Sequence, residues 1–139
     1  MTKRLRDWQS RLQACIAERW ARPFAWGQQD CVLFPADCVS ACTGNDPAKA
    51  MRGTYRDAAG AARLVRDLGG LAAIAAAHCG PEVLPGLAQP GDIGLVLNDG
   101  RECLAVCSGA MWLAPGFVGL CSLPMAQALR AWRLVKAEA

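Results

Sequence analysis

The stretch Trp26-Gly27-Gln28-Gln29-Asp30-Cys31 puts a cysteine directly after an aspartate that is suited to cap a helix. A helix over about 31–43 is predicted to follow, ending near Gly44. Backbone N–H groups at the start of a helix stabilise a thiolate, lower its pKa and can bind an oxyanion. Cys31 is therefore a candidate catalytic nucleophile. A buried structural cysteine that follows a capping residue would give the same pattern.

The chain offers few partners for that nucleophile. A cysteine nucleophile needs a base, usually a histidine, and a group that orients the base. The only histidine is His78, at the end of an alanine-rich segment. A histidine at the end of a helix commonly interacts with the helix dipole, and this role is the alternative to a displaced catalytic base. Asp37 and Asp92 are candidates to orient a base, although Asp92 also suits a turn at the entrance to a strand.

Helical patterns fill the first part of the chain. Pro35 removes a backbone hydrogen bond from the helix after Cys31, so either its first turn is irregular or the regular helix begins near Phe34. A short helix is predicted to start at Asp46-Pro47. Further helices are predicted from apolar spacing over 3–21, 57–68 and 71–78.

Strand patterns fill the second part. After a loop over 80–92, the turn signal Asn98-Asp99-Gly100 predicts a hairpin. The predicted strands cover 93–97, 102–108, 111–114, 117–121 and 131–135. Helices followed by antiparallel strands predict an α+β fold, with N-terminal helices packed on a small C-terminal antiparallel sheet. We expect one domain over 1–139, with a helical part over about 1–80 and a sheet part over about 90–136.

Composition narrows the classes of function. Of the 139 residues, 53% are hydrophobic and 19% charged, and the net charge of +3 is too small and too dispersed to predict nucleic-acid binding. No apolar run reaches the roughly 18 residues of a membrane span, and no apolar signal region follows the basic N-terminus. The chain is therefore expected to fold in a cytoplasm.

Eight cysteines are many for such a chain. Without a secretory signal they are expected to be reduced, buried thiols. The absence of a Cys-x-x-Cys pair weakens a zinc-ribbon interpretation. The alternative is a metal-binding or iron–sulfur module that uses Cys31, Cys38, Cys42 and Cys103.

Several short motifs occur in an order that resembles the NlpC/P60 cysteine peptidases, which are papain-like cell-wall hydrolases, and more closely a related group of tailed-phage tail-tip proteins. The resemblance covers about residues 20–134. Its motifs are Trp26-Gly27, Asp30-Cys31, Ala36-Asp37, Thr43-Gly44-x-Asp46-Pro47-Ala48, Arg52-Gly53-x-Tyr55, Gly69-Gly70-Leu71, Pro90-Gly91-Asp92, Gly119-Leu120 and Ala131-Trp132-Arg133.

The resemblance implies a papain-like fold in which Cys31 matches the nucleophile. It also implies that Cys103 occupies the position of the catalytic histidine. The third polar residue of such a site is expected on the next strand, but the only serines between Leu104 and Ala126 are Ser108 and Ser122, and no His, Asn, Gln, Asp or Glu lies there. Loss of one member of such a triad costs on the order of 10⁴ in rate. A thiol is also a poor base at neutral pH.

The resemblance thus implies an inactive, cofactor-free structural subunit of a phage tail tip or baseplate. It would be assembled in the host bacterial cytoplasm and located in the virion tail, with other tail-tip or hub proteins as partners and peptidoglycan as a further candidate. Two alternatives stay open. One is an active peptidoglycan-cleaving cysteine peptidase or amidase that uses Cys31 with His78, and the other is the cysteine-rich metal module.

Overall fold

The computed structural model describes residues 3–135 as four α-helices and a six-stranded antiparallel sheet. This confirms the predicted α+β class. The helices are α1 (Trp8–Arg19), α2 (Leu33–Thr43), α3 (Ala58–Asp67) and α4 (Leu71–His78). The strands are β1 (Glu82–Val83), β2 (Ile93–Asn98), β3 (Arg101–Cys107), β4 (Met111–Pro115), β5 (Leu120–Pro124) and β6 (Ala128–Trp132), with short 3₁₀ turns at Pro85–Leu87 and Met125–Gln127.

The strands lie in the order β1-β6-β2-β3-β4-β5. The hairpin between β2 and β3 forms as predicted, because Asp99 and Gly100 both take positive φ values, 52° and 75°. The segment 117–121 was expected to be a strand, but residues 116–119 form a turn closed by a hydrogen bond from Gly116 N–H to the Gly119 carbonyl, 2.9 Å long. The last strand ends at Trp132 rather than near residue 135. The predicted loop over 80–92 also contains β1, which pairs with β6.

Two helix predictions differ from the structure. The helix predicted over 3–21 is shorter, because Leu5 leaves the helical path and donates its N–H to the Cys42 carbonyl at 2.8 Å. The segment after Asp46 is a series of turns rather than a helix. Asp46 does accept a hydrogen bond from Ala48 N–H, and the turns run on to Gly53, which has a φ of +79°.

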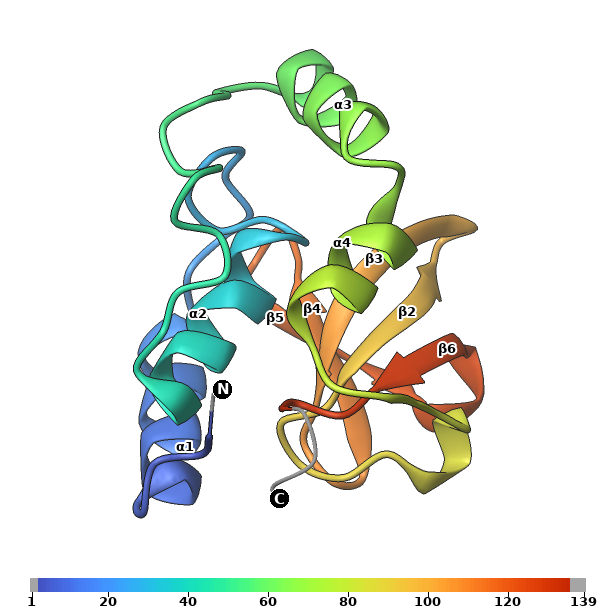
Figure 1. Ribbon diagram of the computed structural model, residues 1–139. Coiled ribbons are helices and arrows are strands. Elements are labelled where there is room, and N and C mark those ends of the chain that lie inside the picture. The colour runs from blue at the N-terminus through green and yellow to red at the C-terminus, as the bar shows by residue number, and fades with distance from the viewer. Residues whose placement is uncertain (1–2, 136–139) are drawn as a thin grey trace.

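The sheet has a buried cluster on each face. One face carries Leu95, Leu104 and Val106, which pack with buried residues of α1, α2 and α4. The other face carries the alternate residues Cys103, Ala105 and Cys107 with Trp112. In Figure 1, α2 and α4 lie against the sheet, whereas α3 stands above α4 and away from the strands. Among residues 3–135, every helix is too short or too polar to cross a bilayer.

Candidate functional site around Cys31

Asp30 organises the chain immediately before α2. Its Oδ1 atom accepts hydrogen bonds from the N–H groups of Val32 and Leu33, at 3.0 and 2.9 Å. Its backbone carbonyl accepts from Phe34 N–H at 3.0 Å. Asp30 therefore caps the irregular turn that leads into α2, whereas the residue directly before the regular helix is Val32 and not Asp30 as predicted. The regular helix begins only at Leu33, because Pro35 has no N–H to donate to the Cys31 carbonyl.

The second carboxylate oxygen of Asp30 ties three separate segments together. Oδ2 accepts from Gly27 N–H at 2.9 Å and from the Tyr55 hydroxyl at 2.5 Å. Asp30 itself is only 1% exposed. Gly27 has a φ of +78°, and a Cβ atom there would lie 2.7 Å from the Tyr55 carbonyl oxygen. Hydrogen bonds to Asp30 thus hold together three of the motifs: Trp26-Gly27, Asp30-Cys31 and Arg52-Gly53-x-Tyr55.

Cys31 directly follows Asp30, where it borders two buried clusters and the Leu104 backbone of β3. Burial, followed by the Asp30 charge, raises the pKa of the Cys31 thiol to about 11, and a hydrogen bond with the Leu104 backbone opposes this only in part. The expectation that the helix N-terminus lowers the Cys31 pKa was therefore wrong. The physical reason is first that burial disfavours the charged thiolate, and second that the Asp30 carboxylate adds a like charge and already accepts from the N–H groups of Val32 and Leu33. At neutral pH the thiol is protonated.

The Cys103 thiol stands near Cys31. Cys103 belongs to the cluster against which Cys31 packs, and its pKa is raised to about 12 by burial and then by the charges of Cys31 and Cys121. Such a thiol stays protonated at neutral pH and cannot accept a proton from Cys31. Ser108, on the strand-to-strand turn, bonds with the Met111 backbone, and Ser122 lies exposed on β5.

His78 lies exposed at the end of α4, as expected for a helix-terminal residue. It lines a small pocket of about 30 Å³, together with Val32 and Leu104. Within residues 3–135 no hydrogen bond or ion pair joins His78 to Cys31. The described structure therefore gives the Cys31 thiol no imidazole in direct contact.

A larger pocket of about 330 Å³ opens beside Cys31. It lies between the start of α2 and residues of α3 and α4. Trp26, Tyr55, Leu64 and Leu71 contribute to its mostly apolar lining. This pocket can hold an apolar group. Its lining includes the charged residues Asp30 and Arg66, and the Asp30 carboxylate already accepts four hydrogen bonds.

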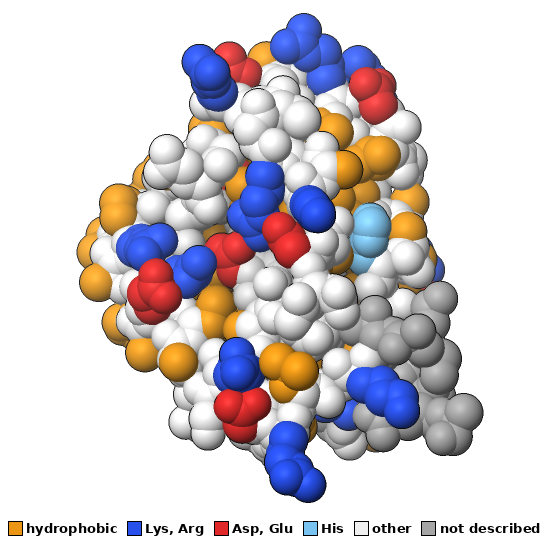
Figure 2. Space-filling view, turned by 60° about the vertical axis from the view of Figure 1, so that its left-hand side comes forward, with side chains coloured by type: hydrophobic (Ala, Val, Ile, Leu, Met, Phe, Trp, Pro, Cys, Tyr) orange, Lys and Arg blue, Asp and Glu red, His pale blue; other side chains and the backbone are white. Residues whose placement is uncertain are grey.

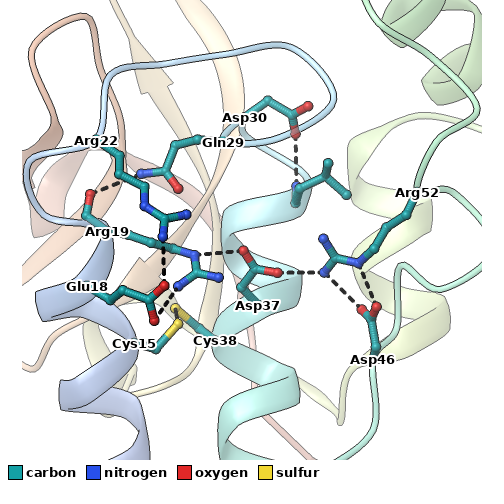
Figure 3. Close-up of polar contacts among 11 residues, drawn as sticks. Cys15, Glu18, Arg19, Arg22, Gln29, Asp30, Asp37, Cys38, Asp46 and Arg52 are labelled. Atoms are coloured by element: carbon teal, nitrogen blue, oxygen red, sulfur yellow. Dashed lines mark hydrogen bonds and ion pairs between the residues drawn. The ribbon is translucent and has the colours of Figure 1, made fainter.

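The two aspartates considered as orienting groups have other partners. Asp37 accepts from Arg19 at 2.8 Å and from Arg52 at 2.6 Å, and Arg52 also binds Asp46 (Figure 3). This network fastens the segment after α2 to α1. Asp92 is fully buried and accepts from Gln89, Arg133 and Leu134, which anchors the end of the described chain. Both residues therefore have structural roles.

The four cysteines of the metal-module hypothesis do not converge. Cys38 and Cys42 lie in the cluster between α2 and α1, whereas Cys103 belongs to the cluster on the opposite face of the sheet. Over residues 3–135 the structure contains no group of three or more His, Cys, Asp or Glu side chains arranged to hold a metal ion.

A family model described as "Domain of unknown function (DUF6950)" matches residues 3–134. The chain belongs to the DUF6950 family. No curated protein and no solved structure matches it.

Sequence reasoning on this DUF6950 chain missed the roles of Gly27 and Tyr55. Both were noted within short motifs, but nothing in a single sequence pairs residue 55 with residue 30. A glycine three residues before a capping aspartate was the available signal, because Gly27 turns the chain so that its N–H faces the carboxylate. The Gly27-x-x-Asp30 spacing was interpreted as part of a catalytic motif, but in the structure it forms a hydrogen-bonded turn.

Proposed function

We propose that this chain is a non-catalytic structural subunit of a tailed-phage tail tip or baseplate, built on an NlpC/P60-like, papain-like fold. The observation that carries the proposal is Cys31 itself. By the resemblance it holds the nucleophile's place and Cys103 the place of the base, yet burial raises the pKa of the two thiols to about 11 and about 12. The tail-tip role and the fold family rest on the resemblance of the ordered motifs.

The surface supports a role in assembly. The segments 20–24 and 116–120 lie side by side. They are joined by hydrogen bonds from Leu120 N–H to the Trp20 carbonyl (2.9 Å) and from Phe24 N–H to the Gly116 carbonyl (2.7 Å). Together they present exposed apolar side chains, Trp20 on one segment and Phe117 and Val118 on the other. Phe117 and Val118 are 94% and 90% exposed. Exposed apolar side chains grouped in this way favour burial against a partner protein, which would be another tail-tip or hub protein.

The charged residues favour the same type of partner. Figure 2 shows acidic and basic side chains interspersed on the visible face, rather than a single basic field. A mixed surface of this kind suits a protein–protein contact better than a nucleic-acid contact.

Zymography on purified peptidoglycan tests the absence of catalysis. We expect no clearing by the wild-type chain and none by Cys31→Ala, because neither contains an ionised thiol paired with a base. A phage endolysin of known activity in the same gel is the positive control. Clearing by the wild type that is lost in Cys31→Ala would establish the alternative, a cysteine peptidase or amidase.

The assembly role needs a separate measurement. Quantitative mass spectrometry of purified tail particles from cells that carry the gene is expected to find the chain in a fixed ratio to the tail-hub protein. Replacement of Phe117 and Val118 by serine, which leaves the buried clusters intact, is expected to remove it from the particles. Particles that lack the wild-type chain would contradict the proposal.

A further inference from the structure

We propose that Cys15 and Cys38 form a peroxide-sensitive dithiol that closes to a disulfide between α1 and α2. Their Sγ atoms lie 4.0 Å apart in a buried contact between the two helices. Figure 3 shows both sulfur atoms below the Arg19–Asp37 ion pair, one on each helix. This pair takes no part in the site around Cys31 and is independent of the tail-tip proposal.

The two thiols differ in their access to solvent. Cys38 is fully buried, whereas Cys15 is 8% exposed and lies in the lining of an open surface groove of about 380 Å³. The side chains of Arg11, Glu18 and Arg19 also line this groove. A molecule as small as hydrogen peroxide can therefore reach Cys15 first, with Cys38 held behind it.

The charges around the pair favour the same order of events. The pKa of Cys15 is lowered, mainly by its hydrogen bond with Cys38 and then by Arg19, although burial, Asp37 and Glu18 oppose the effect. The pKa of Cys38 is raised well above its usual value, first by the same hydrogen bond and then by burial. Cys15 is thus suited to be the attacking thiolate and Cys38 the resolving thiol.

The chemistry uses one peroxide for each pair. The Cys15 thiolate attacks one oxygen of hydrogen peroxide, so an S–O bond forms, the O–O bond breaks and hydroxide leaves. Cys38 then attacks the sulfur of the Cys15 sulfenic acid. The S–S bond forms, the S–O bond breaks, and hydroxide leaves and takes up the Cys38 proton as water. Two thiols lose two electrons and the peroxide is reduced to water.

The disulfide would enclose residues 16–37 in a covalent loop that contains Asp30 and Cys31. Bond formation needs the two sulfur atoms to approach from 4.0 Å to about 2.05 Å, through rotation of the two side chains and a small shift of α1. The closed loop lowers the conformational entropy of the unfolded chain. Oxidation is therefore expected to raise the melting temperature.

The test treats the purified full-length chain with hydrogen peroxide in slight excess, alkylates free thiols and maps cysteine peptides by mass spectrometry. A Cys15–Cys38 cross-linked peptide is expected as the main product. It should form about tenfold faster than any product at Cys79 or Cys107, and dithiothreitol should reverse it. The melting temperature of the oxidised chain should exceed that of the reduced chain.

Two variants separate the steps. In Cys38→Ser, which keeps a hydroxyl donor beside Cys15, Cys15 should stop at the sulfenic acid and be labelled by dimedone, without an intramolecular disulfide. In Cys15→Ala, Cys38 should stay unmodified on the same timescale. Cys42 is the internal competitor, since it lies one helical turn from Cys38 and its thiol donates to the Trp8 carbonyl at 3.9 Å. A Cys38–Cys42 product, or a Cys15 thiol that survives peroxide while other cysteines react, would overturn the proposal.

Discussion

Asp30→Ala is expected to lower the free energy of unfolding by about 3–4 kcal/mol, although it removes only one side chain. Four hydrogen bonds end on that carboxylate, from the N–H groups of Gly27, Val32 and Leu33 and from the Tyr55 hydroxyl. Each donor would be left without its charged acceptor, and those of Val32, Leu33 and Tyr55 lie in buried positions where this loss is costly. Urea unfolding followed by circular dichroism measures the change.

Asp57 provides the matched control. It caps α3 through a single hydrogen bond from Gly60 N–H at 2.8 Å, and it is exposed. Asp57→Ala is therefore expected to cost only about 1 kcal/mol. Tyr55→Phe, which removes one donor from Asp30, should fall between the two, at about 1–2 kcal/mol. Equal losses in the free energy of unfolding for Asp30→Ala and Asp57→Ala would mean that Asp30 contributes only as an ordinary helix cap, and that its bonds to Gly27 and Tyr55 add nothing.

Gly27→Ala is expected to cost about 2–4 kcal/mol, from two sources. A φ of +78° is strained for any residue with a Cβ atom, and that atom would lie 2.7 Å from the Tyr55 carbonyl oxygen. The clash would separate the turn from Tyr55 and weaken both hydrogen bonds to Asp30 Oδ2. Thermal unfolding by calorimetry measures the loss.

The variant Gly53→Ala separates the backbone strain from the steric clash. It has nearly the same φ, +79°, but no atom lies within 4 Å of the position of its missing Cβ. Gly53→Ala therefore carries the backbone strain alone, at about 1 kcal/mol. If Gly27→Ala were no more costly than Gly53→Ala, the close approach between Gly27 and Tyr55 would have no energetic importance.

The sequence predicted those parts of the fold that depend on contacts between residues close together in the chain. Asn98-Asp99-Gly100 fixed the hairpin because both positive φ values lie within the turn. Asp30 was predicted as the cap of α2, and its side chain bonds within three residues. Strand β1 was missed because two residues carry no periodic pattern, and it exists only through pairing with Ala131 and Trp132 far along the chain.

The chemistry of Cys31 depended on contacts that are distant in sequence. A helix start after an aspartate suggested an activated thiol, since helix amides stabilise anions. Burial between α2 and β3, together with the use of those amides by Asp30, reverses the sign of the pKa shift. Neither the burial nor the contact with Tyr55 is visible from residues 26–31 alone. That the chain contains a single histidine, by contrast, was visible in the sequence, because a residue count needs no geometry.

The central claim is that Cys31 is an unionised thiol held in place by a structural carboxylate. A ¹³Cβ chemical-shift titration of cysteine-labelled protein tests it, with the Cys31 signal assigned by its loss in Cys31→Ala. The signal is expected to keep its thiol position up to about pH 9 and to move only as the pH approaches 11. A midpoint below about pH 7 would show an activated thiolate, and that result would contradict the inert site on which the structural role depends.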